Sequence, residues 1–108
     1  RVGEEAETIY YCYVIEEDNC LVGVLSLREL IIARADQPID EIMEREVIAV
    51  PPSASQEETA RLISRYNLLA IPVVDEIKRL LGIVTVDDAI DAVLPTRWKK
   101  RLPKVFSH

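Results

Sequence analysis

Two short motifs place a hydroxyl and a carboxylate three residues apart, each directly after an apolar stretch. These motifs are Ser26-x-x-Glu29 and Thr85-x-x-Asp88. If each motif begins a helix, the free backbone N–H groups and the positive end of the helix dipole attract an anion such as phosphate, and the carboxylate can bind ribose hydroxyls. The same pattern is also a capping box, which stabilises a helix without any ligand. The residues alone leave both interpretations open.

The residues beside the two motifs differ in charge. Arg28 lies just inside the first motif, and Asp87 takes the corresponding place in the second. A guanidinium binds phosphate oxygens, whereas a carboxylate repels them. We therefore expect any nucleotide phosphate to lie at Arg28 first.

Asp88 and Asp91 are one helical turn apart, so they share a face of the expected helix. Mg²⁺ holds its water tightly, and protein sites for it often use one or two carboxylates and keep several waters. The pair is therefore a candidate magnesium site. The alternative is a solvated acidic surface without an ordered ion.

Catalytic motifs are not evident in the sequence. It has one histidine, at position 108, and three glycines, which exclude the P-loop and dinucleotide-binding fingerprints. Cys12 lies in an apolar run and is expected to be a buried thiol rather than a nucleophile. We predict that the protein is not an enzyme.

Charge is unevenly distributed along the chain. The formal net charge is −6, yet the segment from residue 95 onward contains no carboxylate. An acidic body argues against nucleic acid as a partner and leaves divalent cations open, although an acidic surface can also serve solubility alone. No apolar run reaches the roughly 18 residues of a membrane span. The basic residues of the last segment are Arg97, Lys99, Lys100, Arg101 and Lys104.

The elements that must position the motifs occur twice at one constant offset. Residues 13–31 fall on residues 72–90 without a gap, so that Gly23 falls on Gly82. In the first copy we expect strands over 9–15 and 21–25, a turn over 16–19, and a helix from Ser26 with its apolar face buried. Residues 1–8 read as the end of another helix. The predicted buried face of the helix consists of Leu27, Leu30 and Ile31.

The second copy is longer. We expect a helical turn over 39–43, a brief strand over 47–50, a helix from Ser55, strands over 68–74 and 80–84, and a helix from Thr85. The fold class is α/β (α+β), with βαββα repeats of which the first is truncated at its N-terminus. The predicted domains are 1–38, 39–94 and a basic tail or linker over 95–108. The predicted apolar stripes are Thr59, Leu62, Ile63 and Tyr66 on one helix, and Ala89, Ile90 and Val93 on the other.

The repeated unit, closed by Gly82-Ile83-Val84-Thr85-x-x-Asp88, resembles the CBS domain, which occurs in tandem pairs. The stretches AETIYYCYVIEEDNCLVGVLSLRELI, IDEIM, SQEETARLISRY and IPVVDEIKRLLGIVTVDDAIDAV resemble the CBS pair of MgtE-type magnesium transporters. In that family the pair is a cytosolic regulatory module between an N-terminal helical domain and a transmembrane pore domain, and it dimerises. The resemblance implies Mg²⁺ sensing and, in some members, ATP binding.

The resemblance also implies site residues. This sequence departs from the family pattern at four positions. Glu29 stands where an aspartate is usual, Leu68 stands where an aromatic residue would stack better on adenine, and Ser55 and Asn67 stand where relatives carry acids. For Tyr11, Ile48 and Ile71 the alternative role is ordinary core packing. The implied nucleotide-binding residues are Tyr11, Arg28, Glu29, Ile48, Leu68, Ile71, Pro72, Thr85 and Asp88, and the implied metal-binding residues are Glu57, Asp88 and Asp91.

We therefore expect a cytoplasmic regulatory module of a membrane-bound magnesium transporter, which senses Mg²⁺ and ATP or AMP and gates transport. The alternative is an adenine-nucleotide-binding CBS pair that regulates another protein, in a soluble relative without a pore. The expected partners are a second copy, bound through the helices that begin at Ser26, Ser55 and Thr85, and the helical and transmembrane domains of the full-length protein. The basic tail can meet a membrane surface, meet the acidic body of a second copy, or remain solvated.

Overall fold

A computed structural model describes residues 10–95. The chain divides into two compact units, Arg1–Val47 and Ile48–His108, called unit 1 and unit 2 below and described separately. Within residues 10–95, no helix has both the length and the hydropathy to cross a membrane. The predicted helix over residues 1–8 and the basic tail from Arg97 onward lie outside the described residues.

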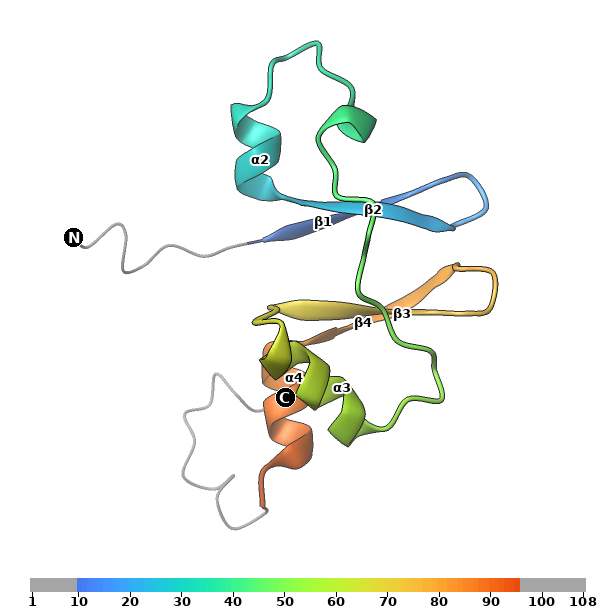
Figure 1. Cartoon of the computed structure of the whole chain (residues 1–108), viewed down its shortest axis with the longest axis vertical. Coiled ribbons are helices and arrows are strands. Elements are labelled where there is room, and N and C mark those ends of the chain that lie inside the picture. The colour runs from blue at the N-terminus through green and yellow to red at the C-terminus, as the bar shows by residue number, and fades with distance from the viewer. Residues whose placement is uncertain (1–9, 96–108) are drawn as a thin grey trace, which may run out of the picture. The chain divides into compact units, whose positions relative to one another are not determined.

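Unit 1 is built on an antiparallel hairpin of β1 (Tyr11–Ile15) and β2 (Leu21–Ser26), followed by the helix α2 (Leu27–Ile32) (Figure 1). The two strands and the helix were predicted and are confirmed. Asn19 closes the turn with a φ of 71°, a left-handed conformation that asparagine tolerates better than most residues. The predicted turn over 16–19 is therefore also confirmed.

The segment after α2 returns to the outer edge of β2. It forms the 3₁₀ turn η1 (Ile39–Glu41), and Glu44 then exchanges two backbone hydrogen bonds with Val24, at 2.8 and 2.9 Å. The neighbouring Met43 lies against Gly23, where an added Cβ atom would be 2.8 Å from Met43 Cγ and 3.2 Å from the Glu44 carbonyl oxygen. Gly23 is therefore required for this close approach.

The predicted buried face of α2 is wrong for the described chain. Leu27 and Leu30 are each 38% exposed and Ile31 is 70% exposed. The reason is that unit 1 offers one hairpin and a six-residue helix, with no second helix among its described residues to cover that face. An amphipathic pattern marks a face that can be buried, but it does not supply the partner.

Unit 2 contains a complete set of elements. These are α3 (Gln56–Arg65), the antiparallel strands β3 (Ala70–Val74) and β4 (Leu80–Thr85), and α4 (Val86–Val93). The two helices pack against each other and against the hairpin (Figure 1). In the hairpin turn the Asp75 carboxylate accepts hydrogen bonds from the backbone of Ile77 and Arg79 and from Arg79 Nε. These bonds lower the pKa of Asp75 from its usual value.

The core of unit 2 consists of Val50, Ile63, Ile71 and Ala89, each almost completely shielded from solvent. The strand predicted over 47–50 is reduced to one parallel bridge, in which Val50 donates to the Pro72 carbonyl and accepts from the Val74 N–H. Pro51 and Pro52 follow and, lacking N–H groups, cannot extend the ladder.

The two predicted helix stripes of unit 2 are confirmed in part. Thr59 and Ile63 are buried on α3 and Ala89 is buried on α4. Tyr66 at the end of α3 is 48% exposed, and Val93 at the end of α4 is 49% exposed, so the predicted burial of Val93 is wrong. Both residues lie at the C-terminal ends of their helices, Tyr66 as the C-cap of α3 and Val93 as the last residue of α4.

Candidate functional site

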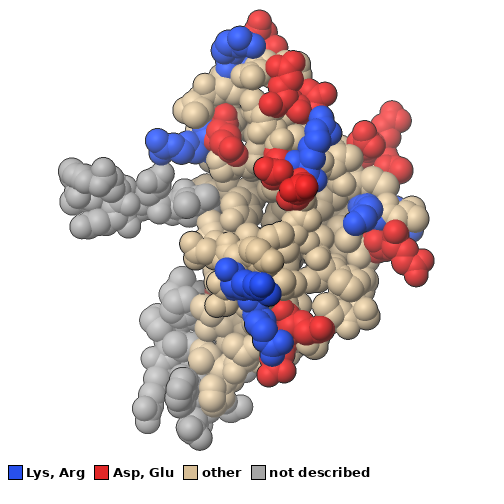
Figure 2. All heavy atoms as spheres, viewed as in Figure 1, with Lys and Arg blue, Asp and Glu red and all other residues tan. Residues whose placement is uncertain are grey.

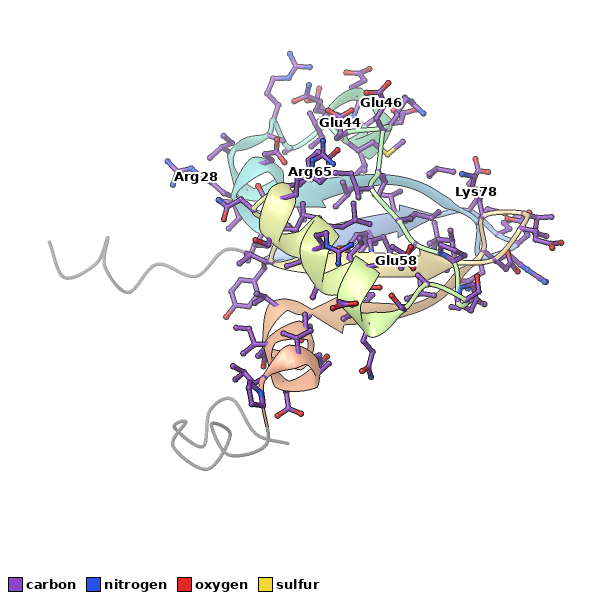
Figure 3. All side chains as sticks on the ribbon, turned by 60° about the horizontal axis from the view of Figure 1, so that its bottom comes forward. Arg28, Glu44, Glu46, Glu58, Arg65 and Lys78 are labelled. Atoms are coloured by element: carbon purple, nitrogen blue, oxygen red, sulfur yellow. The ribbon has the colours of Figure 1, made fainter. Side chains whose placement is uncertain are left out.

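The start of α2 holds three of the predicted nucleotide-binding residues. Ser26 caps the helix: its Oγ accepts from the Glu29 N–H at 3.0 Å, and Glu29 Oε1 accepts from the Ser26 N–H at 2.7 Å. Arg28 lies on the exposed side of α2 (Figure 3). Tyr11 faces Ser26 across the hairpin. The fold of unit 1 thus brings Tyr11, Arg28 and Glu29 to one end of the same hairpin.

The tyrosines of β1 form a half-buried aromatic pair. The rings of Tyr11 and Tyr13 meet edge to face with centroids 6.2 Å apart. Burial, and secondarily the neighbouring Tyr11, raise the pKa of Tyr13 to about 12. Tyr13 is therefore neutral at physiological pH, and the pair offers an aromatic surface rather than a charge.

The start of α4 has a different polar arrangement. Thr85 Oγ1 lies 2.7 Å from Asp87 Oδ1 and 2.9 Å from Asp88 Oδ2, so one hydroxyl proton is shared between two carboxylates. The two bonds of the capping box are longer here, at 3.4 Å each. With two carboxylates in its first turn, this helix start repels a phosphate more strongly than the start of α2, where Arg28 adds a positive charge.

The predicted base-pocket residues of unit 2 belong to its packed interior. Ile71 is fully shielded from solvent, Pro72 is fully buried, and Ile48 and Leu68 pack against the core. Hydrophobic packing accounts for each of these positions. Their role toward a nucleotide stays a prediction from the resemblance.

Unit 2 also contains a pocket of about 290 Å³ that the sequence did not predict. Its wall is mostly apolar and includes one carboxylate, that of the predicted site residue Asp88. The signals in the sequence that could have indicated this pocket are Pro51 and Pro52 and the small side chains of Ala54, Ala89 and Ala92. Alanines leave space that larger residues would fill. The wall consists of Val50, Pro51, Pro52, Ala54, Gln56, Thr59, Val73, Val84, Asp88, Ala89 and Ala92.

The predicted metal-binding residues lie on the first turn of α3 and on α4. Within residues 10–95, no three histidine, cysteine, aspartate or glutamate side chains lie close enough together to hold a metal ion. Glu57, Asp88 and Asp91 therefore do not form a complete ligand set in this part of the chain.

On the face shown in Figure 2, basic side chains of the described residues lie beside acidic ones and do not gather into one positive surface.

Neither Cys12 nor Cys20 forms a disulfide within the described residues. Cys12 faces Leu25 in the middle of the hairpin, while the Cys20 carbonyl accepts from the Glu16 N–H at its far end. Four residues of strand separate these levels by roughly 13 Å, beyond the Cα–Cα distance of about 7 Å that a disulfide spans. The two thiols cannot pair with each other within one hairpin.

Comparison with known proteins gives the same assignment as the repeated motif. Relatives named magnesium transporter MgtE are 50% identical over 93 residues in Thermus thermophilus and 53% identical over 92 residues in Bacillus subtilis. These matches cover 86% and 85% of this chain but 21% and 20% of the relatives, so the chain spans about a fifth of their length. The solved cytosolic domain of the Mg²⁺ channel MgtE in complex with ATP matches with a TM-score of 0.74 at 50% identity, over 86% of this chain and 38% of that one.

The chain also matches the model of a whole family, in addition to the individual relatives. The family profile described as CBS domain covers residues 39–95, which include the complete unit of two helices and two strands. The α+β architecture of the solved relatives agrees with the two hairpins and their helices. The chain therefore belongs to the CBS domain family, with about 50% identity to MgtE magnesium transporters and a structural match to their cytosolic domain.

Proposed function

We propose that this chain is a cytoplasmic regulatory module of a magnesium transporter, regulatory rather than catalytic, which responds to Mg²⁺ and to ATP. The observation that carries the proposal is the match to the MgtE cytosolic domain in complex with ATP, at 50% identity over 86% of this chain. The chain spans about a fifth of its MgtE relatives, so pore and transport belong to the remainder of such a protein. A nucleotide-responsive CBS module of another protein is the competing assignment.

Within unit 1 we assign the nucleotide phosphates to the start of α2. Arg28 supplies a cation there, and the ribose hydroxyls are assigned to Glu29, which must then leave its 2.7 Å bond to the Ser26 N–H or share it. Tyr11 lies across the hairpin from the cap residue and provides an aromatic surface for the base. A charge-assisted hydrogen bond from Arg28 to phosphate contributes about 1.5–3 kcal/mol.

Calorimetric titration of the full chain with ATP and AMP tests this assignment. Arg28→Ala is expected to weaken ATP binding by roughly ten-fold or more, because it removes one charge-assisted hydrogen bond. Arg34→Ala is the matched control: Arg34 is an exposed arginine of the same unit, 3.8 Å from Asp36. Absence of any heat of binding up to millimolar ATP or AMP would reject the nucleotide assignment, and equal affinities of the two variants would move the site away from α2.

Magnesium sensing is assigned to Glu57, Asp88 and Asp91. These carboxylates of α3 and α4 hold Mg²⁺ through its waters, together with groups outside residues 10–95, since the described residues form no complete ligand set. Mg²⁺ is then expected to raise the thermal unfolding midpoint of the domain, and Asp91→Asn to reduce that increase. Glu76→Gln, in the exposed hairpin turn of unit 2, is the control that leaves the increase unchanged.

We also assign dimer formation to the exposed apolar helix faces. On α2 these include Ile31 at 70% and Ile32 at 73% exposure, more apolar surface than so short a helix usually presents to water. Sedimentation at increasing protein concentration is expected to show a dimer that Ile31→Glu weakens. A dimer of unchanged affinity in this variant would place the contact on other helices, and a monomer at every concentration would reject the assignment.

A further inference from the structure

The pocket of unit 2 shares only Asp88 with the sites assigned above. Its wall comes from the segment before α3, from α3 and α4, and from one valine of each strand, Val73 of β3 and Val84 of β4. All of these elements belong to unit 2. A volume of about 290 Å³ is at the lower end of the range for small-molecule sites, so the pocket suits a compact ligand.

Backbone hydrogen bonds and prolines hold the wall of this pocket in place. Val50 donates to the Pro72 carbonyl at 3.0 Å, which ties the segment before α3 to the sheet. Ala54 then donates to the Pro51 carbonyl at 3.1 Å. The rings of Pro51 and Pro52 fix their own φ angles. The pocket is therefore a preformed part of the fold, and a ligand need not order this segment when it binds.

The wall combines apolar side chains with one negative charge. Valine, proline and alanine side chains make up most of it, and the Thr59 hydroxyl already donates to the Ser55 carbonyl at 2.9 Å. Among the described residues that line the pocket, Asp88 is the one with a charged side chain. Its Oδ2 lies 2.9 Å from Thr85 Oγ1, and a carboxylate can accept several hydrogen bonds at once. The Asp88 carboxylate is therefore the group that selects the polar end of a ligand.

The start of α3 also lies at the pocket, because Gln56 on the wall is the first residue of this helix. A helix N-terminus carries roughly half a positive charge, which by itself favours an anion. Glu57 and Glu58 lie in the same turn, and their two negative charges exceed that of the helix dipole. Together with Asp88 they make the surroundings of the pocket negative, so a cation is favoured.

The composition of the wall distinguishes between kinds of cation. Inside the pocket Mg²⁺ would exchange its waters for a single carboxylate among apolar side chains, which this ion resists. No aromatic ring is present among the described lining residues, so a quaternary ammonium would lack cation–π contacts. A primary ammonium donates charge-assisted hydrogen bonds to a carboxylate, and a short alkyl chain attached to it fills apolar space. A neutral apolar ligand would instead take water from Asp88 without replacing its hydrogen bonds.

We propose that this pocket binds a small primary alkylammonium ion. The ammonium group donates to the Asp88 carboxylate, and the alkyl chain lies against the valine, proline and alanine side chains of the wall. The Gln56 amide on the same wall can accept a further N–H bond. This binding requires neither Mg²⁺ nor a nucleotide. Because it engages Asp88, a bound amine competes with Mg²⁺ for that carboxylate.

Titration of the full chain with n-butylammonium chloride tests this assignment, followed by NMR of methyl groups in a metal chelator and without nucleotide. We expect saturable shifts at the methyl groups of Ala54, Ala89 and Ala92 at millimolar amine, and none at Ile31 of unit 1. 1-Butanol has a chain of the same length without the charge and should bind roughly ten-fold more weakly or less. Butyrate, with the opposite charge, should give no saturable shift.

Three variants separate the role of the charge from that of the cavity. Asp88→Asn should weaken n-butylammonium binding by roughly ten-fold or more, since it removes the charge-assisted hydrogen bond. Asp87→Asn is the matched control: it removes the same charge from the same helical turn but not from the wall, and should change the affinity by less than about three-fold. Ala92→Leu keeps the carboxylate but fills part of the pocket, so it should weaken binding by roughly ten-fold as well. Circular dichroism checks that each variant is folded.

Four results would overturn the proposal. The first is the absence of saturable shifts at the lining methyl groups, and the second is equal affinity for n-butylammonium and 1-butanol, which would leave the charge without a role. Binding that Ala92→Leu leaves unchanged would place the amine on the surface of α4 outside the pocket. Shifts of the lining methyl groups with protein concentration, in the absence of amine, would assign the pocket to a second copy. Because the titration contains neither Mg²⁺ nor nucleotide, its failure leaves those two assignments untouched.

Discussion

The two hairpins of this chain share their register to the residue. Tyr11 faces Ser26 in β1–β2 as Ala70 faces Thr85 in β3–β4, and each ladder shifts its register before its last pair. Each second strand then leads through a capping box into a helix. The difference lies in what covers them: unit 2 has α3 and the bridging Val50, and it encloses a core of four buried residues.

In the two units, local backbone geometry and side-chain burial have separate causes. Hairpin formation and helix capping depend on residues near one another in the chain, and both units have them, although the capping bonds at the start of α4 are longer. Burial depends on a second helix from elsewhere in the sequence, and among the described residues only unit 2 has one. The same motif therefore stands on a solvent-exposed helix in one unit and on a packed helix in the other.

The two motifs also differ in electrostatics. The start of α2 has Glu29 in its first turn with Arg28 beside it, and the start of α4 has Asp87 and Asp88 around one threonine hydroxyl. A repeated pattern thus gives one helix start that tolerates an anion and one that disfavours it. This contrast is the physical basis for assigning the nucleotide to unit 1.

The largest difference between the units should appear on truncating a buried and an exposed isoleucine. Ile71→Ala is expected to lower the free energy of unfolding by about 2–5 kcal/mol, because it leaves a cavity in the core of unit 2. Ile31→Ala, on the exposed face of α2, should change it by less than about 0.5 kcal/mol. Urea denaturation followed by circular dichroism measures both, at a concentration where the protein is monomeric. Equal losses would show that α2 is covered as well as the core.

The two equivalent glycines should respond differently to a methyl group. Gly23→Ala is expected to destabilise the protein by about 1–3 kcal/mol, since the new Cβ displaces Met43 and crowds the Glu44 carbonyl. Gly82→Ala should change stability by less than about 0.5 kcal/mol, because an added Cβ meets no atom of the described residues within 4 Å. A large effect at Gly82 would contradict this prediction and would mean that another group fills the space beside it.

Removal of the cap hydroxyl should destabilise the protein more at the start of α3 than at the start of α4. Ser55→Ala is expected to cost about 1 kcal/mol, because both bonds of its capping box are 3.0 Å long. Thr85→Ala should cost less, since its two box bonds are 3.4 Å long. Thermal unfolding of the two variants side by side measures the order. The reverse order would indicate that the hydroxyl shared by Asp87 and Asp88 matters more than the cap.

The smallest effects should appear in the pH dependence, in opposite directions for the two units. The pKa of Tyr13 is raised to about 12, so the unfolded chain releases its proton first, and stability should fall as pH rises from about 10 to 12. The pKa of Asp75 is lowered, so the unfolded chain takes up a proton first as pH falls through about 4, and stability should decrease there. Denaturation curves at several pH values should show the alkaline change reduced by Tyr13→Phe and the acid change reduced by Asp75→Asn. A profile that neither variant alters would contradict both assignments.

Much of the fold was predictable because its signals are local. The four strands, the turn over 16–19 and the three helix caps depend on residues near one another in the chain, and the structure has each of them within two residues of its predicted position. The strand expected over 47–50 does not form, because Pro51 and Pro52 allow a single bridge at Val50 but no ladder. The predicted burial of Ile31 and Val93 is wrong, because an apolar stripe does not show which part of a helix face has a packing partner.

The candidate site was predictable only in part. The family resemblance implied a site that includes Tyr11, Arg28 and Glu29, and the register of the first hairpin places Tyr11 opposite Ser26 at the start of α2. The hydrogen bond from Thr85 to Asp87 was not foreseen, because it depends on the side-chain torsions adopted at the first turn of α4. The apolar pocket beside Asp88 was not foreseen either, since its wall combines α3, α4 and both strands of unit 2.

The repeated unit, its strands, the turn over 16–19 and the capping of each helix follow from the residue pattern, because each depends on backbone preferences and on side chains near one another in the chain. The three-dimensional arrangement settles which apolar faces are buried, that Gly23 is packed while Gly82 has no neighbour among residues 10–95, and that the start of α4 carries a hydroxyl between two carboxylates. These outcomes depend on contacts between residues distant in sequence and on side-chain orientations at the helix start, which the residue pattern leaves free.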